Sequence, residues 1–232
     1  MVDDTPAVRL RDLGFAWRPA AAPLLSIPEF TVGRGERLFL RGPSGSGKTT
    51  LLGLLGGVLV PQRGSVAVLG ETLSALSGSA RDRFRADHVG YIFQMFNLLP
   101  YLSVLDNALL GLRFSRARRR RVSDPRAEAL RLLDALELPD SLLHRPVTEL
   151  SVGQQQRVAA VRALAGGPGL IIADEPTSAL DTTVRERFLA LLFRECERAG
   201  STLIFVSHDP GLAGLFQRVV DLPTLNRAGG GS

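Results

Sequence analysis

The chain has 232 residues, enough for one large or two small domains, and 45% of them are hydrophobic and 22% charged, as in soluble globular proteins. Its longest apolar run, Leu51–Val60, is too short to cross a bilayer, and the lone Cys196 excludes an internal disulfide. Acidic residues near the start, where a signal peptide would be basic, favour a cytoplasmic protein. The net charge of +5 would suit nucleic acid, nucleotides or anionic headgroups.

Short apolar runs along the chain predict β-strands separated by helical patterns, and therefore an α/β protein. The runs around residues 38, 171 and 204 are almost entirely apolar, which predicts parallel strands that are buried on both faces. The six expected strands are Arg37–Leu40, Ser65–Leu69, Val89–Phe93, Leu170–Ala173, Thr202–Val206 and Val219–Leu222.

The first of these strands leads into the stretch G-P-S-G-S-G-K-T, which fits the phosphate-binding loop pattern at every fixed position. The glycines let backbone N–H groups point inward at phosphate oxygens, and the helix that follows directs its positive end to the same place. Lys48 is the only lysine of the chain, and its compact ammonium can reach between two phosphates where the wide fork of arginine fits poorly. The hydroxyl of Thr49 is expected to bind Mg²⁺. The expected nucleotide contacts in this loop are Gly42, Pro43, Ser44, Gly45, Ser46, Gly47, Lys48, Thr49 and Thr50.

The middle of the chain, from about residue 97 to 165, shows almost no strand pattern. Helices are expected at Ser103–Phe114, from Asp124 onward, and at about Ser151–Ala165, which together predict a helical insertion into the α/β core. An arginine-rich stretch at 116–121 is expected to be a solvated loop, with contact to lipid headgroups or a partner as the alternative.

The strand-like run Leu170–Ala173 ends in two carboxylates that can complete a phosphate site. At the carboxyl end of a parallel strand, Asp174 can hold Mg²⁺ through water and Glu175 can polarise an attacking water molecule. The next helix, Thr183–Ala199, places Cys196 on its apolar face, which predicts a packed core thiol.

Four further stretches resemble the motifs of ABC transporter ATPases, in that family's order and over nearly the whole chain. They are "YIFQ" ending at Gln94, "ELSVGQQQRVAAVRAL" at 149–164, "SALD" at 178–181 and "VSHD" at 206–209. The resemblance implies a P-loop NTPase core with a mixed sheet, an N-terminal antiparallel β part and a helical subdomain insertion. It implies a single ABC ATPase domain, with an ATP-binding core at 1–96 and 166–222, a helical subdomain at about 97–165 and a flexible tail at 223–232.

The same resemblance assigns residues to ATP and to a second copy of the chain. Ser151 would cap a helix and, with Gly153 and Gln154, bind the γ-phosphate of an ATP molecule held by the other copy. Asp181 would face that other copy.

Around the chain's own ATP, the resemblance gives three further side chains a role. Gln94 would approach the metal and the attacking water, and His208 would contact the γ-phosphate. Trp17 would stack on adenine, with Phe15 as the competing candidate.

The function implied is that of an ATPase subunit of an ABC transporter, which uses ATP and Mg²⁺. Two copies would sandwich two ATP molecules and drive separate transmembrane permease subunits, from the cytoplasmic face of the membrane and without a nucleic-acid partner. The stretch "FQMFNLLPYLSVLDNALL" resembles the lipoprotein-release and macrolide-exporter group of these ATPases.

Three alternatives stay open to different degrees. The ATPase subunit of a small-solute importer is the nearest one. A soluble ABC ATPase acting on DNA or ribosomes is disfavoured, because the interval between Gln94 and Ser151 shows no sustained heptads. A P-loop kinase or GTPase is disfavoured because it gives no reason for the Ser151 segment, and because a guanine-reading motif would need a second lysine.

Overall fold

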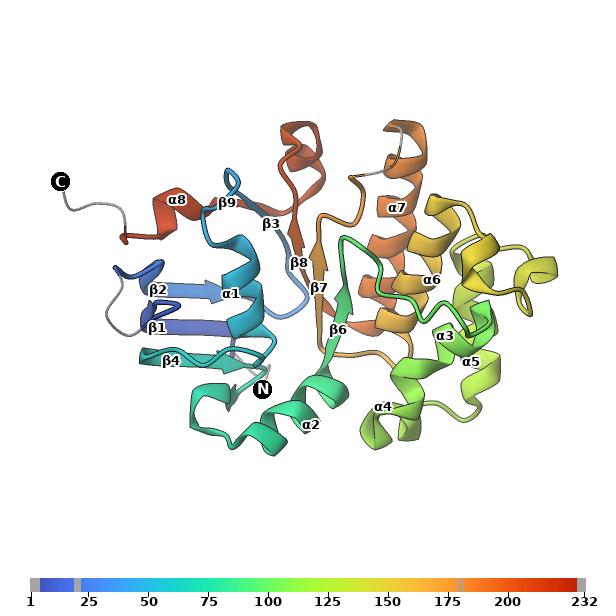
Figure 1. Cartoon of the computed structure of the whole chain (residues 1–232), viewed down its shortest axis with the longest axis horizontal. Helices are drawn as coiled ribbons and strands as arrows, with labels where there is room; N and C mark the ends of the chain where they lie inside the picture. The colour runs from blue at the N-terminus through green and yellow to red at the C-terminus, as the bar shows by residue number, and fades with distance from the viewer. Residues whose placement is uncertain (1–4, 19–21, 179, 181, 229–232) are drawn as a thin grey trace. The chain divides into compact units, whose positions relative to one another are not determined.

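The computed structural model describes residues 5–18, 22–178, 180 and 182–228, and the chain forms two compact units (Figure 1). The first unit comprises Met1–Arg85 and Thr202–Ser232, and the second comprises Ala86–Ser201. The expected boundaries lay near residues 96 and 166. The observed division instead groups the strands around residues 90 and 172 with the helices of the second unit. These strands pack closely against a helix of the second unit, as described below.

The first unit contains the antiparallel sheet that was expected near the N-terminus. Its strands are ordered β2 (Leu25–Val32), β1 (Val8–Phe15), β4 (Arg63–Val68) and β5 (Glu71–Thr72). In β1 and β2, buried apolar side chains alternate with more exposed residues, as expected for a sheet with one face on a core. Gly64 permits a close crossing, because a Cβ there would lie 2.2 Å from the carbonyl oxygen of Arg11.

Parallel strands form the other layer of the first unit. β3 (Arg37–Arg41) pairs in parallel with β8 (Thr202–Val206) and with β9 (Arg218–Asp221). The apolar residues of β3 and β8 are buried, which confirms the prediction from their continuous apolar runs. Phe39, Phe205 and Phe216 pack together with ring centroids 5.1–6.2 Å apart.

Three α-helices begin within the first unit. α1 (Lys48–Leu55) follows β3 and contacts β4, and α8 (Leu222–Leu225) follows β9. α2 (Gly78–His88), which ends just inside the second unit, was not predicted from the sequence; none of its residues is buried, so it has no apolar stripe to recognise. Short 3₁₀ turns lie at Leu73–Ala75 and Pro210–Leu215.

Residues 223–228, which were expected to begin a flexible tail, carry ordered contacts. The side chain of Asn226 accepts a hydrogen bond from the backbone N–H of Ser26 and donates one to the carbonyl of Leu24, both at 2.8 Å. This bridge fastens α8 to the start of β2. The remaining part of the expected tail, 229–232, lies outside the described residues.

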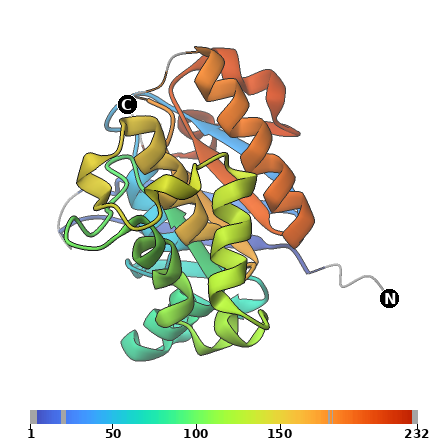
Figure 2. The same ribbon diagram turned by 90° about the vertical axis from the view of Figure 1, so that its right-hand side faces the viewer.

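The second unit combines one parallel strand pair with the expected helices (Figure 2). β6 (Val89–Ile92) pairs in parallel with β7 (Leu170–Asp174). α6 (Val152–Leu164) contacts the helices α3 (Val104–Arg113), α5 (Pro125–Ala135) and α7 (Thr182–Ala199), and it contacts β6. 3₁₀ turns lie at Asp140–Leu142 and Val147–Glu149.

Two glycines allow α6 to be the central helix of this unit. A Cβ at Gly90 of β6 would lie 2.3 Å from the carbonyl oxygen of Ala163, and one at Gly111 of α3 would lie 2.5 Å from that of Arg162. Any side chain at either position would push its element away from α6. Cys196 of α7 is buried, as expected for a core thiol.

The arginine-rich stretch is a short helix rather than the expected solvated loop. α4 (Arg116–Arg120) turns Arg118 inward, where only 3% of the residue is exposed. Its guanidinium donates to the carbonyls of Ala163 at 2.6 Å and Ala165 at 2.8 Å, at the C-terminus of α6. Burial lowers the pKa of Arg118 to about 10, which still leaves it charged at neutral pH. The cation therefore satisfies carbonyls that the end of a helix leaves without donors.

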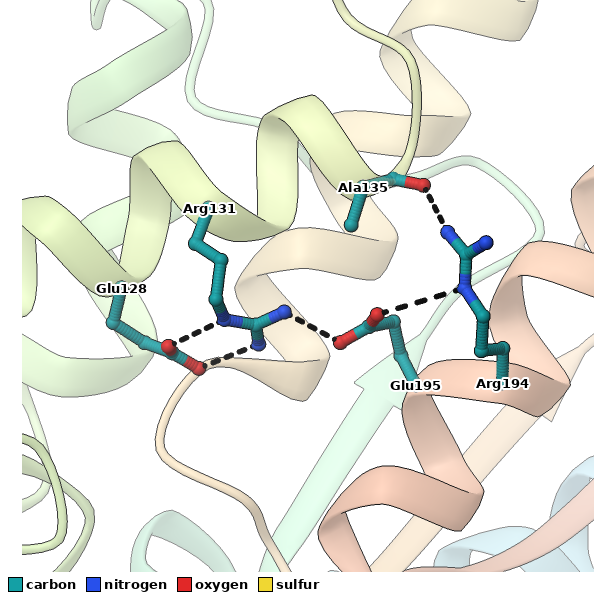
Figure 3. Close-up of polar contacts among 5 residues, drawn as sticks. All are labelled: Glu128, Arg131, Ala135, Arg194 and Glu195. Carbon is teal, nitrogen blue, oxygen red and sulfur yellow. Dashed lines mark hydrogen bonds and ion pairs between the residues drawn. The ribbon is translucent and has the colours of Figure 1, made fainter.

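A charge cluster around the buried Glu195 links α5 to α7 (Figure 3). Arg131 donates to Glu128 at 2.9 Å and to Glu195 at 2.8 Å, and Arg194 donates to the carbonyl of Ala135 at 3.1 Å. Glu195 is only 4% exposed, so its charge depends on Arg131 for compensation.

Candidate phosphate and ATP site

The predicted phosphate loop of the first unit has the backbone that its glycines suggested. β3 ends at Arg41 and α1 begins at Lys48. Gly45 and Gly47 both lie in the left-handed region, with φ of 79° and 97°. A Cβ at Gly47 would also lie 2.8 Å from a methyl carbon of Leu25, so this position requires glycine for two reasons.

Lys48 folds back over this loop. Its Nζ donates to the carbonyl of Gly42 at 2.8 Å and to that of Pro43 at 3.0 Å, which holds the only ammonium side chain of the protein against the loop. The first turn of α1 contains no acidic residue, so the positive end of the helix is not neutralised locally.

One polar atom in the loop points to a missing anionic partner. The hydroxyl oxygen of Ser46 is buried and has no hydrogen-bond partner among the described residues. A Cβ at Gly42 would lie 2.7 Å from that oxygen, so glycine keeps this space open. A hydroxyl without a partner, an ammonium and a helix N-terminus together fit the phosphates of a nucleotide.

The two candidates for the adenine contact differ in exposure. Trp17 is 65% exposed, whereas Phe15 is 6% exposed and packs edge-on against it with ring centroids 5.4 Å apart. The backbone N–H of Leu24 donates to the carbonyl of Phe15 at the end of β1. The side chains of Leu24 and Leu25 both lie beside Gly47. Trp17 therefore has the open aromatic face and belongs to a hairpin that borders the loop; its stacking on adenine stays a prediction.

Strand pairing places His208 at the same edge of the first unit as the start of the phosphate loop. Leu40 of β3 is aligned with Val206 of β8, so Gly42 and His208 each follow two residues beyond a matched pair. His208 is exposed at this edge. Its contact with a γ-phosphate stays a prediction.

In the second unit, strand pairing brings together three predicted side chains. Ile92 of β6 is aligned with Ala173 of β7, so Gln94 and Glu175 each follow two residues beyond a matched pair, and Asp174 ends β7. Tyr91 of β6, which the sequence did not single out, has its pKa raised by burial and, to a smaller extent, by the charge of Asp174.

The backbone at Glu175 is unusual for a residue with a side chain. Its φ is 44°, in the left-handed region. Such conformations cost on the order of 1 kcal/mol or more and are common where a side chain must be aimed. The conformation orients Glu175 immediately after β7, consistent with the predicted role toward a water molecule.

The start of α6 matches the cap that was predicted. The Ser151 hydroxyl accepts from the N–H of Gln154 at 3.3 Å, and the Gln154 side chain accepts from the N–H of Ser151 at 2.9 Å. The side chain of Gln154 thus serves the cap, while Ser151 and Val152 are exposed and no acid lies in the first turn. A Cβ at Gly153 would meet only ordinary contacts, the nearest being a methyl carbon of Leu180 at 3.5 Å. This helix end can accept an anion, and its contact with ATP of a second copy stays a prediction.

Two expectations have no structural counterpart to report. Asp181 lies outside the described residues. No group of three histidine, cysteine or acidic side chains among the described residues could hold a metal ion. Mg²⁺ usually takes one or two protein ligands together with substrate phosphates. The Thr49 hydroxyl lies on the first turn of α1 in the first unit and the Asp174 carboxylate ends β7 in the second unit, and their roles as metal ligands stay predictions.

The second unit also contains a cavity of about 310 Å³ that is separate from these residues. It is lined by residues of α5 and α7 and by Gly166 and Gly167, which precede the amino end of β7. Asp174 and Glu175 lie at the opposite end of that strand, so the cavity is not part of their site. No helix among the described residues is long and apolar enough to span a membrane.

Comparison with known proteins agrees with this geometry. A family profile described as "ABC transporter" matches residues 25–178. The chain is 42% identical over 220 residues to the lipoprotein-releasing system ATP-binding protein LolD of Anaeromyxobacter dehalogenans, covering 94% of this chain and 91% of the relative. It is 40% identical over 201 residues to the macrolide export ATP-binding/permease protein MacB of Rhodopirellula baltica, of which it covers 29%.

A solved structure has the same fold. It is described as the dimeric structure of a post-hydrolysis state of the ATP-binding cassette MJ0796 bound to ADP and Pi, and the protein MJ0796 comes from Methanocaldococcus jannaschii. The two structures align with a TM-score of 0.83 and 33% identity, over 95% of each chain.

Proposed function

Because this chain belongs to the family of ABC transporter ATP-binding domains, we propose that it hydrolyses ATP to drive a transporter of the lipoprotein-releasing type. The observation that carries this proposal is the loop Gly42–Thr49, whose carbonyls hold the Lys48 ammonium and whose buried Ser46 hydroxyl has no hydrogen-bond partner among the described residues. The relatives at 36–42% identity that are named for lipoprotein release support this subtype over a small-solute importer.

Within this proposal, the loop binds the phosphates and Trp17 binds adenine. Backbone N–H groups and Lys48 compensate the charge of the β- and γ-phosphates, and Trp17 offers its exposed face to the base. Mg²⁺, held by Thr49 and through water by Asp174 and Gln94, would neutralise charge that develops on the phosphates.

The hydrolytic step is assigned to Glu175 and His208. Glu175 orients the attacking water and accepts its proton, and Gln94 donates to or accepts from the same water. His208 donates to the γ-phosphate. These assignments are supported by the edges at which the strand pairings place the residues in their own units.

Ser151 and the positive end of α6 are assigned to the γ-phosphate of ATP in a second copy of the chain. The exposure of Ser151 and Val152 supports this, because a helix start that serves another molecule must be accessible. Two copies would then enclose two ATP molecules. The dimeric form of the similar cassette MJ0796 supports the same arrangement.

The transport partner is proposed to be a separate permease, which would hold this chain at the cytoplasmic face of the membrane. LolD is named as the ATP-binding protein of a lipoprotein-releasing system, whereas MacB is named as both ATP-binding and permease protein. The lipoprotein-releasing relatives, whose names give only the ATP-binding role, support a separate permease.

The test is ATP hydrolysis by the purified chain and two Lys48 variants. Lys48→Ala should abolish turnover mainly by weakening nucleotide binding, and Lys48→Arg should also be severely impaired, since a planar fork does not replace a point charge over the loop. Arg34→Lys, at an exposed site away from the loop, is the control and should keep normal turnover. Near-normal turnover of Lys48→Arg would overturn the role given to Lys48, and a wild-type chain that binds no ATP would overturn the function.

A further inference from the structure

Arg162, near the end of α6, holds the segment that follows β6. Its two terminal nitrogens donate to the carbonyl oxygens of Phe96 and Asn97, both at 2.6 Å. Burial lowers the pKa of Arg162, which reflects how far its guanidinium is withdrawn from water. Hydrogen bonds from a charged donor are stronger in such surroundings.

The two residues that Arg162 holds have a strained backbone. Phe96 and Asn97 have φ of 57° and 50°, in the left-handed region that residues with side chains rarely adopt. The turn closes with hydrogen bonds from the N–H of Phe96 to Phe93 and from that of Asn97 to Met95. Two successive left-handed residues persist only where neighbouring groups favour them, and here the guanidinium supplies that stabilisation.

The backbone of Arg162 is itself fixed from two sides. Its carbonyl oxygen faces Gly111 of α3 at a distance that leaves no room for a Cβ, and it accepts from Arg118 at 3.3 Å. The side chain therefore extends from a fixed point of α6. α6 runs without a break from its capping box at Ser151 to the end that Arg118 bonds, so Ser151 and Arg162 belong to one continuous helix.

From this juxtaposition we propose that Arg162 is a positioning residue that makes the Gln94 segment follow the movements of α6. Gln94 lies two residues before the held turn, and Ser151 starts the helix from which Arg162 extends, about 16 Å away along its axis. Engagement of Ser151 by a nucleotide in the second copy would thus be transmitted to Gln94. This consequence rests on the proposed function, whereas the positioning of the turn does not.

Hydrogen exchange in the absence of nucleotide tests the positioning. Arg162→Lys keeps the charge but replaces the fork with one ammonium, which cannot hold both carbonyls in the same way. Exchange of the amides of Phe96 and Asn97 should become about tenfold faster, the effect of losing one charge-assisted hydrogen bond. Arg121→Lys is the matched control, because Arg121 also donates to two successive carbonyls, those of Gly166 and Gly167.

The kinetics of ATP hydrolysis test the consequence for the reaction. Arg162→Lys should lower kcat on the order of tenfold and change KM for ATP little, since the phosphate loop is untouched. Arg121→Lys should change neither. Thermal unfolding of both variants, compared with the wild type, separates loss of the turn from loss of the fold.

The outcomes divide clearly. Faster exchange at Phe96 and Asn97 in Arg162→Lys alone, with an unchanged unfolding midpoint, supports the positioning role. Unchanged exchange in Arg162→Lys, or equal acceleration at these amides in Arg121→Lys, overturns it. A wild-type chain without ATP turnover would overturn the proposed function and leave the exchange result valid.

Discussion

At the scale of single residues, Trp17 and Phe15 show how two aromatic neighbours at the end of β1 come to differ in exposure. They are two residues apart, yet Trp17 is largely exposed and Phe15 is buried beneath it. β1 ends at the buried Phe15 and Trp17 lies just beyond it, so the exposed ring is the one that is accessible to a ligand.

This difference predicts separate effects of their removal. Trp17→Ala should weaken ATP binding by about 1–3 kcal/mol, the scale of stacking between a base and an aromatic ring. Phe15→Ala should leave affinity nearly unchanged and lower the free energy of unfolding by about 3–5 kcal/mol, as for other buried aromatic residues. Calorimetric titration with ATP and urea unfolding measure the two effects. A loss of affinity confined to Phe15→Ala, at unchanged stability, would assign adenine to Phe15 instead.

At the scale of secondary-structure elements, several charged and capping hydrogen bonds lie at the ends of helices. α6 starts with a reciprocal cap at Ser151 and ends on the buried cation Arg118. α3 starts at Ser103, whose hydroxyl accepts from the N–H of Asp106 and donates to its carboxylate at 2.7 Å. Both helices thus place charge where their dipoles favour it.

Removing the cation from the end of α6 should destabilise the protein. Arg118→Met keeps the volume of the side chain but leaves the carbonyls of Ala163 and Ala165 without their donor. We expect the free energy of unfolding to fall by about 1–3 kcal/mol, the cost of leaving buried polar groups unpaired. Arg120→Met, on the exposed face of the same helix, should change it by less than about 0.5 kcal/mol. Equal effects in urea unfolding would mean that Arg118 does not act as a cap.

The cap of α3 predicts a pH dependence with a definite sign. The hydrogen bond from Ser103, aided by Arg113, lowers the pKa of Asp106. A carboxylate whose pKa is lowered by folding stabilises the protein above its unfolded pKa of about 3.9, and this contribution is lost as the pH falls further. Asp106→Asn should therefore destabilise most near pH 7 and progressively less below about pH 4. Thermal unfolding from pH 3 to 7 checks this, and a pH-independent difference would refute it.

At the scale of the whole molecule, the assigned roles predict an assembly that depends on nucleotide. Two copies that share ATP should associate when it binds and separate when it is hydrolysed. A variant that binds ATP but cleaves it slowly should therefore accumulate as a dimer.

Glu175→Gln is that variant. It removes the acceptor for the water's proton while keeping the size of the side chain, so turnover should fall about 10²–10⁴-fold and ATP binding should persist. Light scattering after size exclusion should show a dimer with Mg-ATP and a monomer without it. Adding Ser151→Arg should abolish the dimer, because a bulky side chain obstructs the γ-phosphate of the other copy. Wild-type turnover by Glu175→Gln would remove Glu175 from catalysis.

The sequence by itself determined the features whose chemistry is local. The phosphate loop, the Ser151 cap and the carboxylates after β7 each depend on residues close together in the chain, so spacing and residue type predicted them. The parallel strands were predicted for a similar reason, since burial on both faces demands a continuous apolar run.

Tertiary structure decided the features that depend on partners far along the chain. The sequence shows five arginines in 116–121 and a sixth at 162. It does not distinguish arginines that are surrounded by solvent from arginines that bind carbonyl groups. Arg118 is buried because the end of α6 presents unpaired carbonyls, and Arg162 is engaged because a left-handed turn brings two more within reach. Tertiary packing also decided that Trp17 is exposed and Phe15 buried, whereas α2 escaped prediction because none of its residues is buried and no apolar stripe marks it.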